Sequence, residues 1–182
     1  MKQISVIGSA ASDLSADICR LSEVLGQEIA KAGYTVLTGA SRGVGENAAK
    51  GAKSMGGVTI GINPAGNVED ARAFHVGTNF HDFMVYTGMG YKGRNVVLVR
   101  SGDGVIAVNG QFGTLNEITI AEGERKPIVV LEGSGGAADL ASDLFAKLSP
   151  DYPFFKTAKT PAEAVAKMTE LLKEKQREFS SD

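Results

Sequence analysis

The sequence predicts an α/β protein with a mostly parallel sheet, a Rossmann-like three-layer αβα sandwich. Strand-like apolar runs alternate with segments of helical periodicity along the whole chain. The 23 glycines cluster at junctions that follow apolar runs, as expected for an α/β protein with tight ligand loops. A chain of 182 residues without a domain-splitting linker fits one domain spanning residues 1–182.

The expected strands are short apolar runs bounded by turn residues. The clearest is Gly104–Val108, which lies directly before a glycine turn. Continuous apolar runs of this kind are typical of strands that are buried on both faces of a parallel sheet. In chain order, the expected strands are Ile4–Ile7, Tyr34–Thr38, Val58–Ile62, Asp82–Tyr86, Gly104–Val108 and Pro127–Leu131.

Helices are expected where apolar residues recur every three or four positions. Gly33 is well placed to end the first helix as its C′ residue. The last helix starts with Thr160 at the N-cap, Pro161 at N1 and Glu163 in a capping box. Its charged end, Lys173–Asp182, is expected to fray. The other expected helices are Ile18–Ala32, Glu46–Met55, Thr114–Glu124 and Ala137–Leu148.

The segment Arg94–Arg100 carries conflicting signals. Its Asn-Val-Val-Leu-Val run has high strand propensity. A strand there would leave only Ser101, Gly102 and Asp103 before the next strand, which forces an antiparallel hairpin into a parallel pattern. Propensity alone does not decide between a strand and a helix.

Composition excludes several classes of protein. The net charge of −2, without a Lys/Arg stripe, lacks the electrostatic footprint of nucleic-acid binding. The single Cys19 excludes an intrachain disulfide and a multi-cysteine metal site. No apolar stretch approaches the roughly 18 residues of a membrane span, and the chain opens with a strand rather than a signal peptide. We therefore expect a cytoplasmic protein with no nucleic-acid or membrane partner.

Glycine-rich or small-residue turns follow the first, second and fifth expected strands. They are Gly8–Ser12, Thr38–Gly45 and Asn109–Thr114. The first lacks the dinucleotide fingerprint Gly-x-Gly-x-x-Gly, and no Walker Gly-Lys-Ser/Thr occurs. Each turn taken alone is compatible with a tight strand–helix connection. Together at one sheet edge, they predict an anion site built from backbone N–H groups and helix N-termini.

Glu117 stands on the first turn of the helix that is expected to open at Thr114. A carboxylate is a poor phosphate ligand, but it is suited to chemistry beside a bound phosphate. The sequence therefore predicts a phosphate-bearing small molecule as the ligand, with Glu117 as a candidate reactive group.

The segment Asn109–Glu117, with Arg94 located 15 positions before Asn109, resembles the signature of the LONELY GUY (LOG) family. That family pairs an Arg-Lys helix motif with Pro-Gly-Gly-x-Gly-Thr-x-x-Glu at the same separation. The Gly39–Gly45 loop resembles the family's first glycine loop, and the match spans roughly residues 3 to 131. The resemblance extends to the wider group of Rossmann-like proteins long mislabelled as lysine decarboxylases. It implies cleavage of the N-glycosidic bond of a nucleoside 5′-monophosphate, which releases free base and ribose 5-phosphate.

The resemblance also assigns roles to residues. It implies that Arg94 is the catalytic arginine, which holds phosphate or ribose oxygens through bidentate hydrogen bonds. It implies that Glu117 is the catalytic carboxylate, which stabilises positive charge on the sugar and orients a water. We expect neither a metal nor a cofactor. The expected phosphate-binding residues are Gly8, Ser9, Gly39, Ala40, Ser41, Gly110, Gly113 and Thr114.

The family's arginine lies on a helix, so the resemblance predicts that Tyr91–Arg100 is helical. It also implies a homodimer or higher homo-oligomer with this helix near the interface. Several β-branched residues on one helix are better explained by packing than by propensity. We therefore expect Val96, Val97 and Val99 to be partly covered by a partner subunit.

The chain departs from the LOG pattern at Asn109, Gln111 and Asn95, where the family has Pro, Gly and Lys. Gln111 adds a side chain where the backbone should approach a phosphate closely. These changes resemble a divergent branch whose members are described as nucleotide-binding or molybdenum-cofactor carriers. Two hypotheses therefore stand: a phosphoribohydrolase, or a non-catalytic carrier of a nucleotide or pterin phosphate.

The two histidines, His75 and His81, are six positions apart on no regular face. This spacing does not suit a metal pair, and we expect both residues in a loop. An alternative is that this loop covers the ligand.

Overall fold

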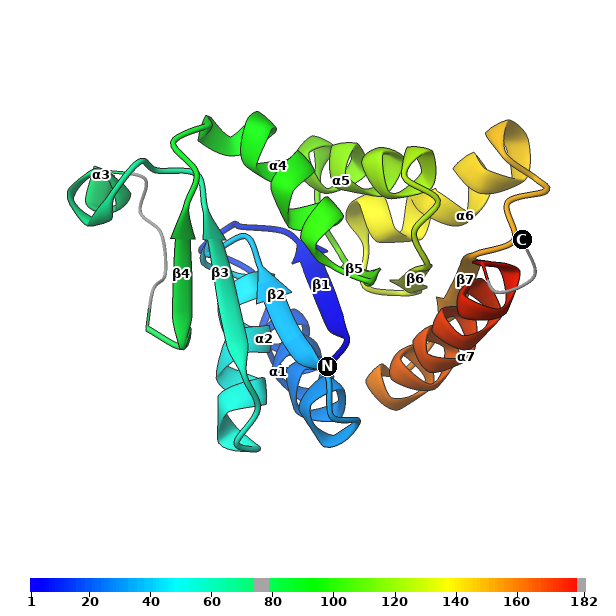
Figure 1. Ribbon diagram of the computed structural model, residues 1–182, viewed down its shortest axis with the longest axis horizontal. Coiled ribbons are helices and arrows are strands. Elements are labelled where there is room, and N and C mark those ends of the chain that lie inside the picture. Colours follow the sequence, from blue (N-terminus) through cyan, green and yellow to red (C-terminus); the bar gives the residue numbers. More distant parts are fainter. Residues whose placement is uncertain (74–78, 180–182) are drawn as a thin grey trace.

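The computed structural model describes residues 1–73 and 79–179. It is a three-layer αβα sandwich around one parallel sheet with the strand order β4-β3-β2-β1-β5-β6-β7 (Figure 1). The predicted fold class is confirmed. The strands are β1 (Gln3–Gly8), β2 (Thr35–Thr38), β3 (Thr59–Asn63), β4 (Phe83–Tyr86), β5 (Gly104–Val108), β6 (Ile128–Leu131) and β7 (Phe155–Ala158). The helices are α1 (Ala16–Lys31), α2 (Val44–Ser54), α3 (Val68–Ala73), α4 (Gly90–Ser101), α5 (Phe112–Gly123), α6 (Gly136–Leu148) and α7 (Pro161–Phe179).

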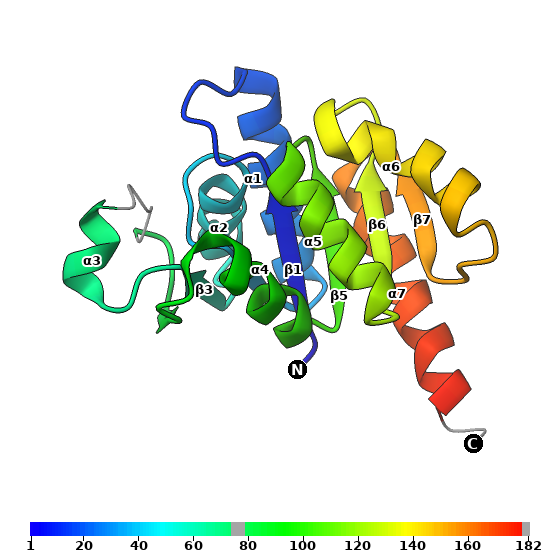
Figure 2. The same cartoon turned by 90° about the horizontal axis from the view of Figure 1, so that it is seen from above.

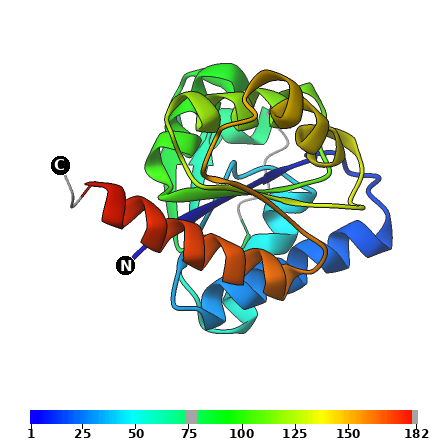
Figure 3. The same ribbon diagram turned by 90° about the vertical axis from the view of Figure 1, so that its right-hand side faces the viewer.

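Helices cover both faces of the sheet. Helices α1, α2 and α7 pack on one face, and α4, α5 and α6 pack on the other (Figure 3). The alternation of side chains along β1 divides the core between the two layers: Ile4 and Val6 face the first set of helices, and Ile7 faces the second. Helix α3 lies at the β4 end of the sheet, away from the core (Figures 1 and 2).

The helical prediction for the ambiguous segment is correct, because α4 spans Gly90–Ser101. Leu98 and Val99 of α4 are buried in the core of the protomer, at 1% and 0% exposure. The expectation that Val99 contacts a partner subunit is therefore wrong, whereas Val96 and Val97 are half-buried on the surface. The apolar run is compatible with a helix here because α4 buries one of its faces against the sheet.

Two elements of the structure were not predicted from the sequence. Strand β7 is a short edge strand whose Lys156 and Thr157 interrupt any apolar run. Helix α3 has only six residues. Helix α7 continues to Phe179, so it includes most of the segment Lys173–Asp182, whose fraying stays a prediction.

The topology creates a crevice beside β1. The chain builds outward from β1 through β2 and β3 to β4, and then returns through α4 to β5 on the other side of β1. In open parallel sheets, ligands bind outside the carboxyl ends of the strands at such a switch point. The turns after β1, β2 and β5 meet there.

Candidate functional site

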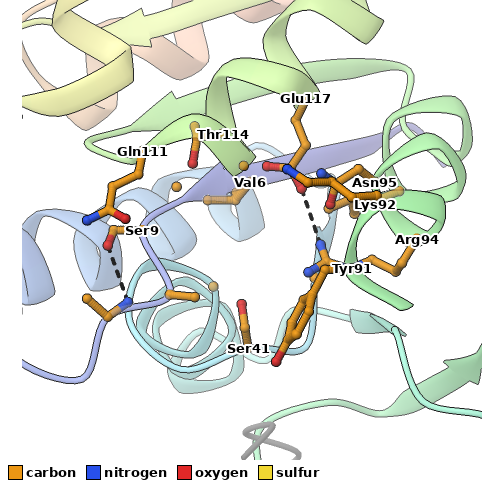
Figure 4. A pocket seen from close by; sticks show the side chains of 17 residues that line it. Val6, Ser9, Ser41, Tyr91, Lys92, Arg94, Asn95, Gln111, Thr114 and Glu117 are labelled. Atoms are coloured by element: carbon orange, nitrogen blue, oxygen red, sulfur yellow. Dashed lines mark hydrogen bonds and ion pairs between the residues drawn. The ribbon is translucent and has the colours of Figure 1, made fainter. Parts of the chain in front are cut away.

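A cavity of about 290 Å³ opens at this switch point. Its walls come from the turns after β1 and β2 and from the first turns of α2, α4 and α5 (Figure 4). The lining residues are Val6, Gly8, Ser9, Ala10, Ala11, Gly39, Ser41, Gly45, Tyr91, Lys92, Arg94, Asn95, Leu98, Gln111, Gly113, Thr114 and Glu117.

The helices that begin at the cavity have no capping side chain. The N-caps of α2, α4 and α5 are Gly43, Met89 and Gln111, and none of their side chains accepts a hydrogen bond from the helix. Helix α1, in contrast, is capped by Ser15, whose hydroxyl accepts from the Ile18 N–H.

The first N–H groups of a helix have no partner inside the helix. The first N–H groups of α2 and α4 do have partners outside the helix, because Val44 donates to the Ser9 carbonyl at 3.0 Å and Gly90 to the Pro64 carbonyl at 3.1 Å. The start of α5 is therefore the helix end at this cavity that most favours an anionic ligand.

Helix α6 begins nearby, but the chain itself satisfies its N-terminus. The N–H groups of Ala137 and Ala138 donate to the carbonyls of Gly110 and Asn109, at 2.8 and 3.1 Å. Asn109 has a φ of 53° and anchors the turn through its amide, which donates to the Ser134 carbonyl at 2.7 Å. Its side-chain oxygen accepts from the Gly110 N–H at 2.5 Å. This N–H is thus committed to the turn.

The conformation of Asn109 explains one departure from the LOG pattern. Proline is fixed at a φ near −65°, so a proline could not adopt the φ of 53° that Asn109 has here. The Asn109 N–H also donates to Ser134 Oγ at 2.8 Å, a bond that proline cannot make. Gln111 has φ −124° and ψ −156°, an extended conformation that does not require glycine. Asn109 and Gln111 therefore suit the backbone conformation of this turn.

Arg94 and Glu117 form a buried ion pair at one wall of the cavity. Arg94 Nη1 lies 3.2 Å from Glu117 Oε1, and the two side chains are 6% and 7% exposed. Gly39 lies against the guanidinium so closely that a Cβ at this position would collide with Nη1. Arg94 Nε is buried and has no acceptor among the described residues. The guanidinium is thus held by the β2 turn on one side and by Glu117 on the other.

Burial dominates the protonation of this pair. It raises the pKa of Glu117 to about 7, although the positive charges of Arg94 and Lys92 act in the opposite direction. Burial also lowers the pKa of Arg94, and the charge of Glu117 opposes that change. A carboxyl group that titrates near neutral pH beside a cavity is a candidate acid or base.

The turn after β1 forms the opposite wall. The Ser9 carbonyl accepts from the Val44 N–H at 3.0 Å, and Ser9 Oγ accepts from the Ala11 N–H at 3.2 Å. Gly43, at a φ of 74°, sits against the Ser9 carbonyl where a Cβ would collide. These contacts join the start of α2 to the end of β1.

The structure brings most of the sequence-predicted residues together. Of the ten, Ala40 and Gly110 are not part of the lining. Ala40 is fully buried at a φ of 50°, and its N–H donates to Thr38 Oγ1 at 3.0 Å. Both residues therefore shape the turns behind the cavity. The eight that line it are Gly8, Ser9, Gly39, Ser41, Arg94, Gly113, Thr114 and Glu117.

Four further residues line the cavity, although the sequence did not identify them as binding residues: Tyr91, Lys92, Asn95 and Gln111. Three of them lie on the first turns of α4, whose position against the cavity follows from the tertiary fold. The signal that could have found part of this set was the helical period, which places residue 91 one turn before both Arg94 and residue 95.

His81 lies near the site but not in it. Its Nε2 is 2.7 Å from Thr38 Oγ1, so it contacts the end of β2 behind the glycine turn. His75 lies outside the described residues. In the described part of the chain, no group of three or more His, Cys, Asp or Glu side chains could hold a metal ion. No helix there is long and apolar enough to cross a membrane.

The fold and the cavity define a Rossmann-like protein, with glycine turns and the starts of α2, α4 and α5 at the switch point of its sheet. Residues 1–165 match the model of the SLOG cluster4 family, and the chain belongs to that family. An uncharacterized protein of Archaeoglobus fulgidus is 40% identical over 139 residues, covering 73% of this chain and 85% of that protein.

Solved structures place the chain in the divergent branch that the sequence suggested. TM1055, a structural-genomics target, superposes with a TM-score of 0.82 at 29% identity, over 93% of this chain and 99% of that one. The molybdenum cofactor binding protein of Rippkaea orientalis gives 0.77 at 33% identity, over 95% and 96%. The molybdenum cofactor carrier protein of Chlamydomonas reinhardtii gives 0.79 at 30% identity, over 95% and 99%.

Proposed function

We propose that the cavity binds the phosphate group of a nucleoside 5′-monophosphate and that the protein hydrolyses its N-glycosidic bond. The products are the free base and ribose 5-phosphate. The observation that carries this proposal is the buried Arg94–Glu117 pair, which lines the same cavity as the uncapped start of α5.

The order of residues along α5 suits such a substrate. Thr114 and Glu117 both line the cavity and are one helical turn apart, about 5 Å along the axis. A phosphate held by the N–H groups of Gly113 and Thr114 therefore places the attached sugar near the carboxylate. Lys92, at the start of α4, adds a positive charge to the same space.

In the proposed reaction, water attacks the anomeric carbon and the bond to the base nitrogen breaks, so the base leaves with the bonding electrons and takes up a proton from solvent, to which Glu117 later returns the proton of the water. Glu117 accepts the proton of the water and stabilises the positive charge that develops on the sugar. The carboxylate must be ionised for this role. Because burial raises the pKa of Glu117 to about 7, the rate should rise with pH through the neutral range.

Base release from common nucleoside monophosphates, measured by chromatography, tests the proposal. Glu117→Gln keeps the shape of the side chain but removes the charge, and it should lower the rate by at least ~100-fold with binding nearly unchanged. Arg94→Ala should weaken both binding and rate, since it removes a guanidinium that can hold phosphate or ribose oxygens. Absence of base release by the wild-type protein from any common monophosphate would refute the enzymatic proposal.

A second candidate is a non-catalytic carrier of a pterin phosphate such as the molybdenum cofactor. The specific observation is that two structures with that description cover 95% of this chain at 33% and 30% identity. The uncapped start of α5 at the cavity suits the phosphate of either ligand. Mass spectrometry of the small molecule that co-purifies distinguishes them, because a retained pterin phosphate favours the carrier and a free base or ribose 5-phosphate favours the enzyme.

A further inference from the structure

Asn95 lies next to Glu117, within hydrogen-bond distance of its carboxylate. It is 4% exposed and lines the cavity from α4 (Figure 4). Its nitrogen can donate to Asn116 Oδ1 at 3.0 Å, but its oxygen then faces only acceptors, Glu117 Oε1 and the Tyr91 carbonyl. With the nitrogen toward the acceptors, it donates to Oε1 at 3.0 Å and to the Tyr91 carbonyl at 2.9 Å. The Asn116 amide turns with it, so that the Asn116 nitrogen donates to the Asn95 oxygen and no acceptor faces an acceptor.

Glu117 Oε1 then receives two donors, Arg94 Nη1 at 3.2 Å and the Asn95 amide at 3.0 Å. No described residue donates a hydrogen bond to Oε2. An oxygen held by two donors is a poor place for a proton, because both lone pairs are engaged. Oε2 is therefore the oxygen that accepts a proton or contacts a ligand.

We propose that Asn95 is a positioning residue for Glu117: its amide and Arg94 hold Oε1 and turn Oε2 toward the ligand. The role of Oε2 toward a ligand rests on the function proposed above, whereas the Asn95–Glu117 contact does not. The charged groups that face Glu117 are Arg94 and Lys92, both on α4. The neighbouring β1 and the turn after β2 present no charged side chain to the cavity, since their lining residues are Val6, Gly8, Gly39 and Ser41.

The LOG pattern has a lysine where this chain has Asn95. A lysine would bring a further positive charge to the carboxylate, whereas an amide stabilises the ionised form only through a hydrogen bond. Burial raises the pKa of Glu117 to about 7, and the charges that oppose it are those of Arg94 and Lys92.

The test is the pKa of Glu117 in the ligand-free protein, measured by carbon NMR of glutamate labelled at the side-chain carboxyl. The signal is assigned by its loss in Glu117→Gln. Asn95→Leu removes the donor and should raise the pKa by about one unit. Asn95→Asp keeps the shape but adds a like charge, so it should raise the upper apparent pKa further. Asn95→Lys should lower the pKa below the wild-type value.

Val97→Ala is the matched control, since it alters packing on α4 without changing a polar group. It should leave the pKa of Glu117 unchanged. Circular dichroism establishes that each variant is folded, and the isosteric Asn95→Asp carries the test if Asn95→Leu does not fold. Equal Glu117 pKa values in the wild type and in the Leu, Asp and Lys variants would overturn the proposal. Because no turnover is measured, this result is independent of whether the protein is a hydrolase.

Discussion

Replacing Glu117 by glutamine should change how the stability of the protein depends on pH. Burial raises the pKa of Glu117 from an ordinary value of 4.5 to about 7. The folded protein therefore holds a proton that the unfolded chain releases, and this contribution to stability is complete below pH 4.5 and is lost as the pH rises through 7. The interval of 7 minus 4.5, at about 1.4 kcal/mol per pH unit, corresponds to about 3 kcal/mol. The glutamine side chain of the variant does not titrate, so the variant lacks this dependence.

The assay is urea unfolding of the wild type and Glu117→Gln between pH 5 and 8, with the free energy of unfolding taken at each pH. All other titrating groups are common to both proteins, so the difference between their free energies isolates Glu117. As the pH rises, the free energy of unfolding of the wild type should fall by about 3 kcal/mol relative to that of Glu117→Gln. The control is Thr119→Ala, an exposed change on α5, which should follow the wild-type curve. A difference between wild type and Glu117→Gln that is flat from pH 5 to 8 would refute this reasoning.

Three further predictions concern binding, packing and assembly. Thr114→Val should weaken the binding of inorganic phosphate about tenfold in isothermal titration, since it removes one donor, and equal affinities of the wild type for a nucleoside and its 5′-monophosphate would exclude a phosphate site. Gly39→Ala should lower the free energy of unfolding by about 1–3 kcal/mol, because the new Cβ meets the Arg94 guanidinium, whereas Gly123→Ala, where a Cβ meets open space, should not. Light scattering should give a mass of at least twice the 19.0 kDa of one chain, and a mass of one chain at micromolar concentration would contradict the proposed homodimer.

The parts of the fold that the sequence predicts are those set by local patterns. The apolar run Gly104–Val108 and the capping box at Thr160 are legible because each needs only neighbouring residues. The helix Gly90–Ser101 was decided by family resemblance, because its β-branched residues favour a strand and only tertiary packing on the sheet selects the helix. Strand β7 was missed for a related reason: at the sheet edge it is half exposed, so little burial is written into its sequence.

The candidate site also contains features that local sequence patterns predict and features that only the fold determines. The glycine turns were predictable because a turn that ends a strand and opens a helix is a contiguous signal. The Arg94–Glu117 pair came from the family pattern, and its burial and short distance are properties of the fold. The conformation of Asn109 could not be foreseen, because it depends on the bond to Ser134, which lies 25 positions later in the chain.

The charge of Glu117 bears on the choice between the two proposed functions. A hydrolase needs the carboxylate ionised, since only the anion stabilises a positive sugar and accepts a proton from water. A carrier needs only an anion site, and a protonated Glu117 leaves the Arg94 charge unopposed beside the uncapped start of α5. With a pKa of about 7, Glu117 is partly ionised and partly protonated near neutral pH. Together with burial, the contacts of Asn95 and Arg94 with one carboxylate oxygen set the pH at which the carboxyl group ionises.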